Sequence, residues 1–172
     1  MNELNSSRQS LISAQADGRL SLNESEGKVL LAEAGIPVPK FGVAKSAEEA
    51  ERLAAQMSPN YAVKVIAEGL SHKSDAGGVM INLAHAVAVG EAVRQMGSDP
   101  RLSGHVVEGW LVEEMAPVGR EFMVGGLNDP TFGPMVMVGL GGIFVEVFED
   151  ISVRMCPITK MDAEEMLDEL RG

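Results

Sequence analysis

The chain has 172 residues, of which 45% are hydrophobic, and its 14 Lys and Arg against 25 Asp and Glu give a formal net charge of −11. This length suffices for one compact domain or for two small lobes that share a cleft, and the hydrophobic content excludes a disordered tail. The acidic charge argues against nucleic acid and anionic membranes as partners, because both carry negative charge themselves.

Targeting and redox signals point to a cytoplasmic protein. The chain starts with the polar stretch MNELNSSRQS, whereas a secretory signal needs an apolar stretch there. No apolar run approaches the roughly 18 residues of a membrane span. The single cysteine, Cys156, cannot form an internal disulfide, which fits a reducing compartment.

The first predicted helices are marked by their caps. Residues 1–20 show no sustained periodicity and are expected to form an N-terminal arm. Asn23 followed three positions later by Glu26 is a capping-box pattern, and it predicts a helix that ends at Gly35. Ser46 begins a second such helix. The stretch between them, GIPVPKFGVA, is predicted to be an extended connection because its prolines forbid a helix.

Strands dominate the rest of the chain. YAVKVIA alternates like a strand, GVMINL reads as a second strand, and AHAVAVGEAVRQMG reads as a helix. Four further strands of one largely antiparallel sheet are predicted at 110–115, 121–127, 134–140 and 143–149. SVRMCPI adds another strand, and MDAEEMLDEL is an amphipathic helix. The turn-rich stretch GSDPRLSGH separates a first lobe (21–100) from a second lobe (101–172), and a cleft between lobes is a common ligand site.

A basic, glycine-containing segment is the strongest chemical signal. Lys64 lies mid-strand among apolar neighbours, so it either reaches the surface or neutralises an anion. In HKSDAGGV, the glycine pair Gly77 and Gly78 can let backbone N–H groups point at phosphate oxygens. The loop matches neither a Walker A motif nor GxGxxG. Lys73 and Lys64 are the best cations for an anionic ligand, and His72 is either a solvated loop residue or a nucleophile near phosphates.

The acidic strands admit two interpretations. Alternation sends Glu113 and Glu114 to opposite faces of their strand, so one carboxylate could enter the cleft, and the strand end could offer a backbone donor and acceptor to a purine. The alternative is an edge strand that carries protective charges. Glu121 and Glu146 could likewise be solvated. Glu146 is nevertheless a candidate magnesium ligand, because Mg²⁺ prefers oxygen ligands beside substrate phosphates.

Longer stretches of the sequence resemble a known family. YAVKVIAEGLSHKSDAGGV, together with WLVEEMAPVGREFMVGG and FGPMVMVGLGGIFVEV, is similar to the ATP-grasp (beta) subunit of NDP-forming acyl-CoA synthetases, the ADP-forming acetyl-CoA synthetase family. The resemblance covers most of the chain beyond the N-terminal arm. It implies an α+β ATP-grasp fold, with a nucleotide between two α+β lobes.

The resemblance also implies roles for individual residues. Lys64 would touch the nucleotide phosphates, and Gly77 with Gly78 would form the flexible loop above them. Residues Glu113 to Met115 would be the hinge that reads adenine, and Glu121 would face the ribose. The implied ligands are ATP or ADP with Mg²⁺.

His72 matches the histidine that family members use to relay a phosphoryl group between the nucleotide and a phosphohistidine on a CoA-binding alpha subunit. The implied reaction converts acyl-CoA, ADP and phosphate into acid, CoA and ATP, reversibly. Transfer of this kind needs positioning and charge neutralisation, which lysines, backbone N–H groups and a metal ion can supply.

The chain departs from the family pattern at its end. Family members continue through a segment with a DINP-like strand that supplies magnesium ligands, so we expect an incomplete C-terminal part and doubtful activity for this chain alone. A missing strand would expose a sheet edge and would allow a homodimer. The alternatives are a non-catalytic nucleotide-binding or interaction module with a degraded metal site, and another ATP-grasp carboxylate ligase. The SHKSDAGGV loop argues against the ligase, which needs no relay histidine.

Overall fold

The computed structural model of the chain describes residues 11–12, 14–16, 18–19, 21–70, 73–141 and 150–171. The chain forms two compact units, Met1–Ala116 and Pro117–Gly172. The N-terminal arm predicted for residues 1–20 lies largely outside the described residues, and we describe the two units in turn.

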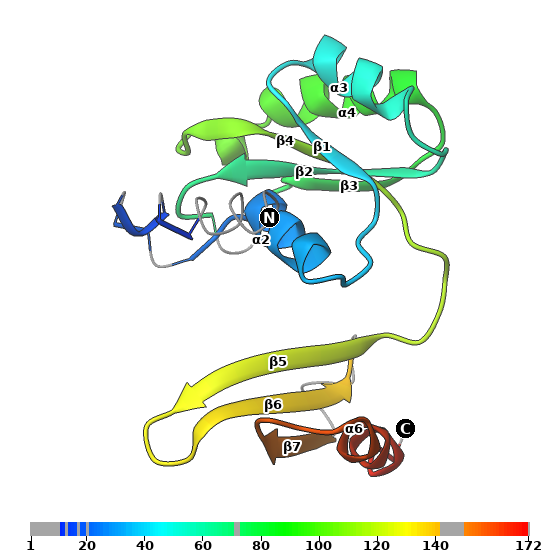
Figure 1. Cartoon of the computed structure of the whole chain (residues 1–172). Helices are drawn as coiled ribbons and strands as arrows, with labels where there is room; N and C mark the ends of the chain where they lie inside the picture. Colours follow the sequence, from blue (N-terminus) through cyan, green and yellow to red (C-terminus); the bar gives the residue numbers. More distant parts are fainter. Residues whose placement is uncertain are drawn as a thin grey trace. The chain divides into compact units, whose positions relative to one another are not determined.

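The first unit is a four-stranded antiparallel sheet with helices on both faces (Figure 1). Its strands run in the order β1-β4-β2-β3, helices α3 and α4 lie side by side on one face, and α2 lies on the other. The elements are α2 (Glu24–Glu33), β1 (Phe41–Ala44), α3 (Ala47–Ala54), β2 (Tyr61–Ala67), β3 (Val79–Leu83), α4 (Ala86–Gly97), the 3-10 turn η1 (Pro100–Leu102) and β4 (Val107–Glu114).

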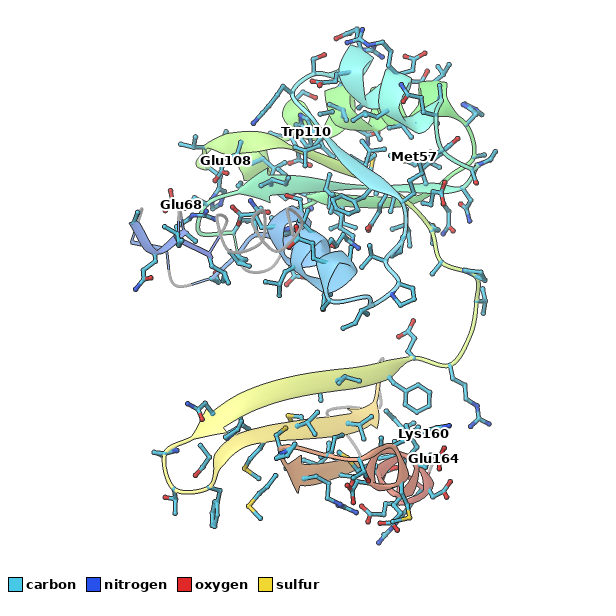
Figure 2. All side chains as sticks on the ribbon, viewed as in Figure 1. Met57, Glu68, Glu108, Trp110, Lys160 and Glu164 are labelled. Atoms are coloured by element: carbon cyan, nitrogen blue, oxygen red, sulfur yellow. The ribbon has the colours of Figure 1, made fainter. Side chains whose placement is uncertain are left out.

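The core of this unit lies between the sheet and the α3–α4 layer. Val63 and Val65 of β2 are fully buried there, and so is Val112 of the neighbouring strand β4. Trp110 points into the same layer from β4 and is 6% exposed (Figure 2). Burial of these side chains removes apolar surface from water, which is the main stabilising term of a domain this size. The alternation predicted for β2 is confirmed.

The predicted helix caps are confirmed. Asn23 Oδ1 accepts a hydrogen bond from the Glu26 backbone N–H at 3.0 Å, and the Asn23 N–H donates to Glu26 Oε2 at 2.8 Å. Ser46 caps α3, and Gly35 follows α2 with a φ of +79°, a conformation that favours glycine. These caps fix where α2 begins, and α2 carries part of the site described below.

The second unit is a three-stranded antiparallel sheet, β5-β6-β7, with one helix. Strands β5 (Phe122–Asp129) and β6 (Gly133–Leu140) pair along their full length, and β6 also pairs with β7 (Ile151–Met155). Helix α6 (Lys160–Asp168) lies along this sheet. Arg154 of β7 forms an ion pair with Glu169, just beyond that helix. Lys160 and Glu164 lie on the helix's solvent side (Figure 2).

Three sequence predictions differ from the structure. The strand at 107–114 pairs with β1 and β2 in the first unit and not with β5, because its apolar residues complete the core below α3 and α4. The two units therefore divide at Ala116 and Pro117, whereas the boundary was predicted at 97–105. The extended connection before α3 also contains the short strand β1. The strand predicted at 143–149 lies outside the described residues.

Among the described helices, none has both the length and the apolar character that a membrane crossing requires.

Candidate functional site

Five charged side chains meet on the face of the first sheet that carries α2. Lys64 Nζ lies 2.6 Å from Glu24 Oε1 and 2.7 Å from Glu113 Oε1. Lys28 Nζ lies 2.8 Å from Glu113 Oε2, and Lys73 Nζ lies 3.6 Å from Glu24 Oε2. We call these five residues the lysine–glutamate cluster. Three ammonium groups against two carboxylates leave it with one net positive charge.

The sheet register and one helix bring the cluster together. Residue 62 of β2 pairs with Glu113 of β4, so Lys64, two residues further on, has its side chain on the same face as Glu113. Glu24 and Lys28 are four residues apart on α2, which places both on one side of that helix. Lys73 follows β2 in the turn that leads to β3.

The charges stabilise one another despite burial. Glu113 is only 5% exposed, and burial raises the pKa of its carboxyl, but the ammonium groups of Lys28 and Lys64 outweigh this and hold the pKa below its ordinary value. Burial lowers the pKa of Lys64, and the carboxylates of Glu113 and Glu24 more than restore it, so the net shift is upward. Both groups are therefore charged at neutral pH.

The two glutamates are held differently. The Glu113 side chain is 7% exposed and lies between two ammonium groups. Its Oε2 lies 2.8 Å from Lys28 Nζ, and its Oε1 lies 2.7 Å from Lys64 Nζ. The Glu24 side chain is 30% exposed and lies at the first residue of α2. Glu113 is thus enclosed within the cluster, whereas the Glu24 carboxylate is partly open to solvent.

The turn of residues 73–78 closes on itself. The Gly77 N–H donates to the Ser74 carbonyl at 3.1 Å, and the Gly78 N–H donates to the Lys73 carbonyl at 2.7 Å. The Gly78 carbonyl accepts from the Val65 N–H at 2.8 Å, which ties the turn to β2. The sequence predicted that the two glycine N–H groups can point outward at phosphate oxygens. In this structure both are instead engaged within the turn.

These glycines are required for close packing. A Cβ atom at Gly78 would lie 2.4 Å from Cγ1 of the buried Val65, closer than any side chain can approach. Gly77 has a φ of +70°, which glycine adopts without strain. The glycine pair thus lets the turn lie directly against the strand that carries Lys64.

The predicted hinge residues also have partners within the first unit. Glu113 and Glu114 point to opposite faces, as the alternation predicted, and Glu114 Oε1 accepts from the Ser58 N–H at 2.6 Å. The Met115 N–H donates to the Asn60 carbonyl at 2.9 Å. Glu121 belongs to the second unit and is exposed. His72 and Glu146 lie outside the described residues.

Glu24 and Lys28 are the site residues that sequence reasoning missed. Both lie in the helix that was predicted from its cap, and the four-residue spacing of opposite charges was visible there. Their meeting with Lys64 depends on α2 lying against one face of the first sheet (Figure 1), which no local pattern encodes. Lys28 Nζ also lies 5.9 Å from the centroid of the Phe41 ring, a cation–π distance.

Among the described residues, no group of three or more His, Cys, Asp and Glu side chains is arranged to hold a metal ion. The cluster is instead suited to an anion, because two of its ammonium groups converge on the one carboxylate that is partly exposed.

Comparison with known proteins identifies the class. The family model described as "ATP-grasp domain" matches residues 13–172. The chain therefore belongs to the ATP-grasp family, and the predicted α+β ATP-grasp fold is confirmed.

Within that family, the matches include several ADP-forming acid–CoA ligases. The beta subunit of acetate–CoA ligase [ADP-forming] I from Pyrococcus furiosus is 41% identical over 174 residues, covering 100% of this chain and 75% of the relative. The beta subunit of the second such ligase from the same organism is 36% identical, covering 91% and 67%. Acetate–CoA ligase [ADP-forming] I from Archaeoglobus fulgidus is 37% identical over 86% of this chain but only 22% of that longer protein. The predicted resemblance to the beta subunit is confirmed.

Solved structures of similar proteins agree with the matches to these ligases. Acetyl-coenzyme A synthetase 1 of Ca. Korarchaeum cryptofilum, in complex with coenzyme A and Ca-AMPCP, matches with a TM-score of 0.91 and 42% identity over 96% of this chain and 73% of that chain. A complex of the same enzyme with coenzyme A and Mg-AMPPCP matches with a TM-score of 0.83 and 39% identity, covering 96% and 71%. Its phosphohistidine segment is described as pointing towards the nucleotide-binding site.

Proposed function

We propose that this chain is the nucleotide-binding portion of an NDP-forming acyl-CoA synthetase and binds ATP or ADP, together with Mg²⁺, at the lysine–glutamate cluster. The observation that carries the proposal is the convergence of Lys64 and Lys73 on the Glu24 carboxylate, at 2.6 Å and 3.6 Å. A phosphate chain offers oxygens of the same kind and more negative charge, so it can replace that carboxylate between the two ammonium groups.

The buried glutamate favours the same ligand. The ion pair with the buried Glu113 fixes the direction of the Lys64 ammonium group. Less side-chain entropy is therefore lost when Lys64 binds a ligand. A fixed cation stabilises the charge of a phosphoryl group better than a mobile one, because it needs no reorganisation during the reaction. Mg²⁺ would supply further neutralisation of the phosphates when bound with the nucleotide. We propose Glu146 as one of its ligands.

The proposed chemistry is a phosphoryl relay through His72, the residue before Lys73. The neutral imidazole accepts the phosphoryl group from a phosphohistidine of a CoA-binding partner subunit or domain, where the N–P bond breaks. A terminal oxygen of ADP then bonds to the phosphorus, and the bond to His72 breaks to give ATP. Coupled to the partner, this interconverts acyl-CoA, ADP and phosphate with acid, CoA and ATP. We also propose that Glu113 to Met115 and Glu121 contact the nucleoside.

The relay is tested by locating the phosphate. The purified chain is incubated with Mg-ATP, digested and analysed by mass spectrometry under conditions that preserve phosphohistidine. We expect a phosphoryl group on the peptide that contains His72. It should be absent in His72→Asn and present in His105→Asn, a matched change at a histidine without an assigned role. ATP binding without phosphorylation of His72 would refute the relay and would indicate a nucleotide-binding module without this chemistry.

A further inference from the structure

The turn of residues 73–78 is held from outside as well as by its own hydrogen bonds. A Cβ atom built on Gly77 would lie 2.3 Å from Arg101 Nη2 and 2.7 Å from its Cζ. The guanidinium group of Arg101 therefore rests directly on the backbone of Gly77. It also donates a long hydrogen bond, 3.4 Å, from Nη1 to the Asp75 carbonyl.

Arg101 is itself anchored. Its Nη2 lies 2.7 Å and its Nε 3.0 Å from the two carboxylate oxygens of Asp99, a bidentate arrangement that fixes the plane of the guanidinium group. The same carboxylate accepts the Arg101 backbone N–H at 2.9 Å. These hydrogen bonds lower the pKa of Asp99 to about 2, so the anchor is charged at any physiological pH. The adjacent Leu102 is buried in the core and fixes the turn η1.

We propose that Arg101, oriented by Asp99, is a positioning residue that clamps the glycine turn and thereby places Lys73 in the lysine–glutamate cluster. The Gly78 N–H is bonded to the Lys73 carbonyl at 2.7 Å, so a constraint on Gly77 is transmitted across the turn to Lys73. An ion pair this exposed, with 59% of the Arg101 side chain accessible, adds little to stability. Its contact with the turn is what distinguishes it from other surface pairs.

The clamp rests on the proposed function only for its effect on nucleotide binding, and its effect on the turn can be measured without any ligand. In Arg101→Met, we expect the exchange rates of the Gly77 and Gly78 backbone amides to rise about fivefold over wild type. This factor corresponds to the upper end of the stabilisation measured for exposed ion pairs. Asp99→Asn keeps a side-chain oxygen to cap η1 and should also raise the exchange rates of these two amides. Arg94→Met removes a comparable surface pair with Glu48 elsewhere and should leave these amides unchanged.

The second readout is the dissociation constant for Mg-ATP. We expect Arg101→Met to weaken binding about fivefold with an unchanged thermal midpoint, and Arg101→Lys to restore part of the loss. Gly77→Ala would displace the guanidinium group, so adding Arg101→Met to it should weaken binding by less than about twofold more, because both changes remove one interaction. Unchanged amide exchange in Arg101→Met would overturn the clamp. If the wild-type chain failed to bind Mg-ATP, the proposed function would fail, and the exchange experiment would still decide the clamp.

Discussion

Replacing Glu113 with Gln tests how the cluster is built. The change keeps the size of the side chain but removes a charge that lies between Lys28 and Lys64 at 2.8 Å and 2.7 Å. Breaking a buried ion pair by removing one partner costs about 3–5 kcal/mol. Here Lys64 keeps Glu24, and the two lysine side chains are 15% and 26% exposed, so water recovers part of that cost. We expect a loss of about 2–3 kcal/mol in the free energy of unfolding.

Urea denaturation followed by tryptophan fluorescence measures this loss. The chain has a single tryptophan, Trp110, which is buried in the first unit, so its emission reports the unfolding of the unit that contains the cluster. With a urea dependence of about 1–3 kcal/mol per M, the midpoint should fall by about 1 M. Glu48→Gln is the control, because its pair with Arg94 is exposed at both ends and its loss should barely move the midpoint. Equal shifts in the two variants would refute our account of Glu113 as the buried anchor.

Three further predictions concern pH, glycine packing and competition. Because the pKa of Glu113 is lowered in the folded state, its contribution is present above about pH 4.5 and is lost as the pH falls through the folded pKa. The difference in urea midpoint between wild type and Glu113→Gln should therefore shrink on acidification. Gly78→Ala should destabilise the first unit by about 1–3 kcal/mol, because the new Cβ meets the buried Val65, whereas Gly27→Ala, with open space around it inside α2, should stabilise it by about 0.5–1 kcal/mol. Glu24→Gln should tighten Mg-ATP binding about threefold in calorimetry, since the carboxylate competes for two lysines, and weaker binding would show that Glu24 instead supports the site.

Local chemistry made much of the fold predictable. The capping box at Asn23, the cap at Ser46 and the strand predicted at residues 61–67 each depend on groups within a few residues of one another, and each matches the structure. The strand at 107–114 shows that local patterns do not predict which strands pair with each other. Its pattern predicted a strand, but its partners are β1 and β2, far away in the sequence. Pairing of that kind is decided by where the apolar side chains of the strand become buried, here in the core of the first unit.

The same limit applies to the site. Lys64 was singled out because an ammonium group among apolar neighbours either reaches the surface or neutralises an anion. In the structure its partners are two glutamates of the chain itself. One of them, Glu24, lies 40 residues earlier, on a helix whose face toward the sheet cannot be read from its weak amphipathic pattern. The glycine pair was recognised for its conformational freedom, but its packing against Val65 and Arg101 emerged only from the tertiary structure.

The central claim is that Lys64 and its cluster bind the phosphates of a nucleotide. The most direct test is calorimetric titration of Mg-ATP into the wild-type chain, Lys64→Met and the control Lys160→Met, which removes an exposed lysine of the second unit. We expect the wild type and the control to bind equally and Lys64→Met to bind at least about tenfold more weakly, the loss expected for a charge-assisted contact. Equal affinity in all three proteins would contradict the account.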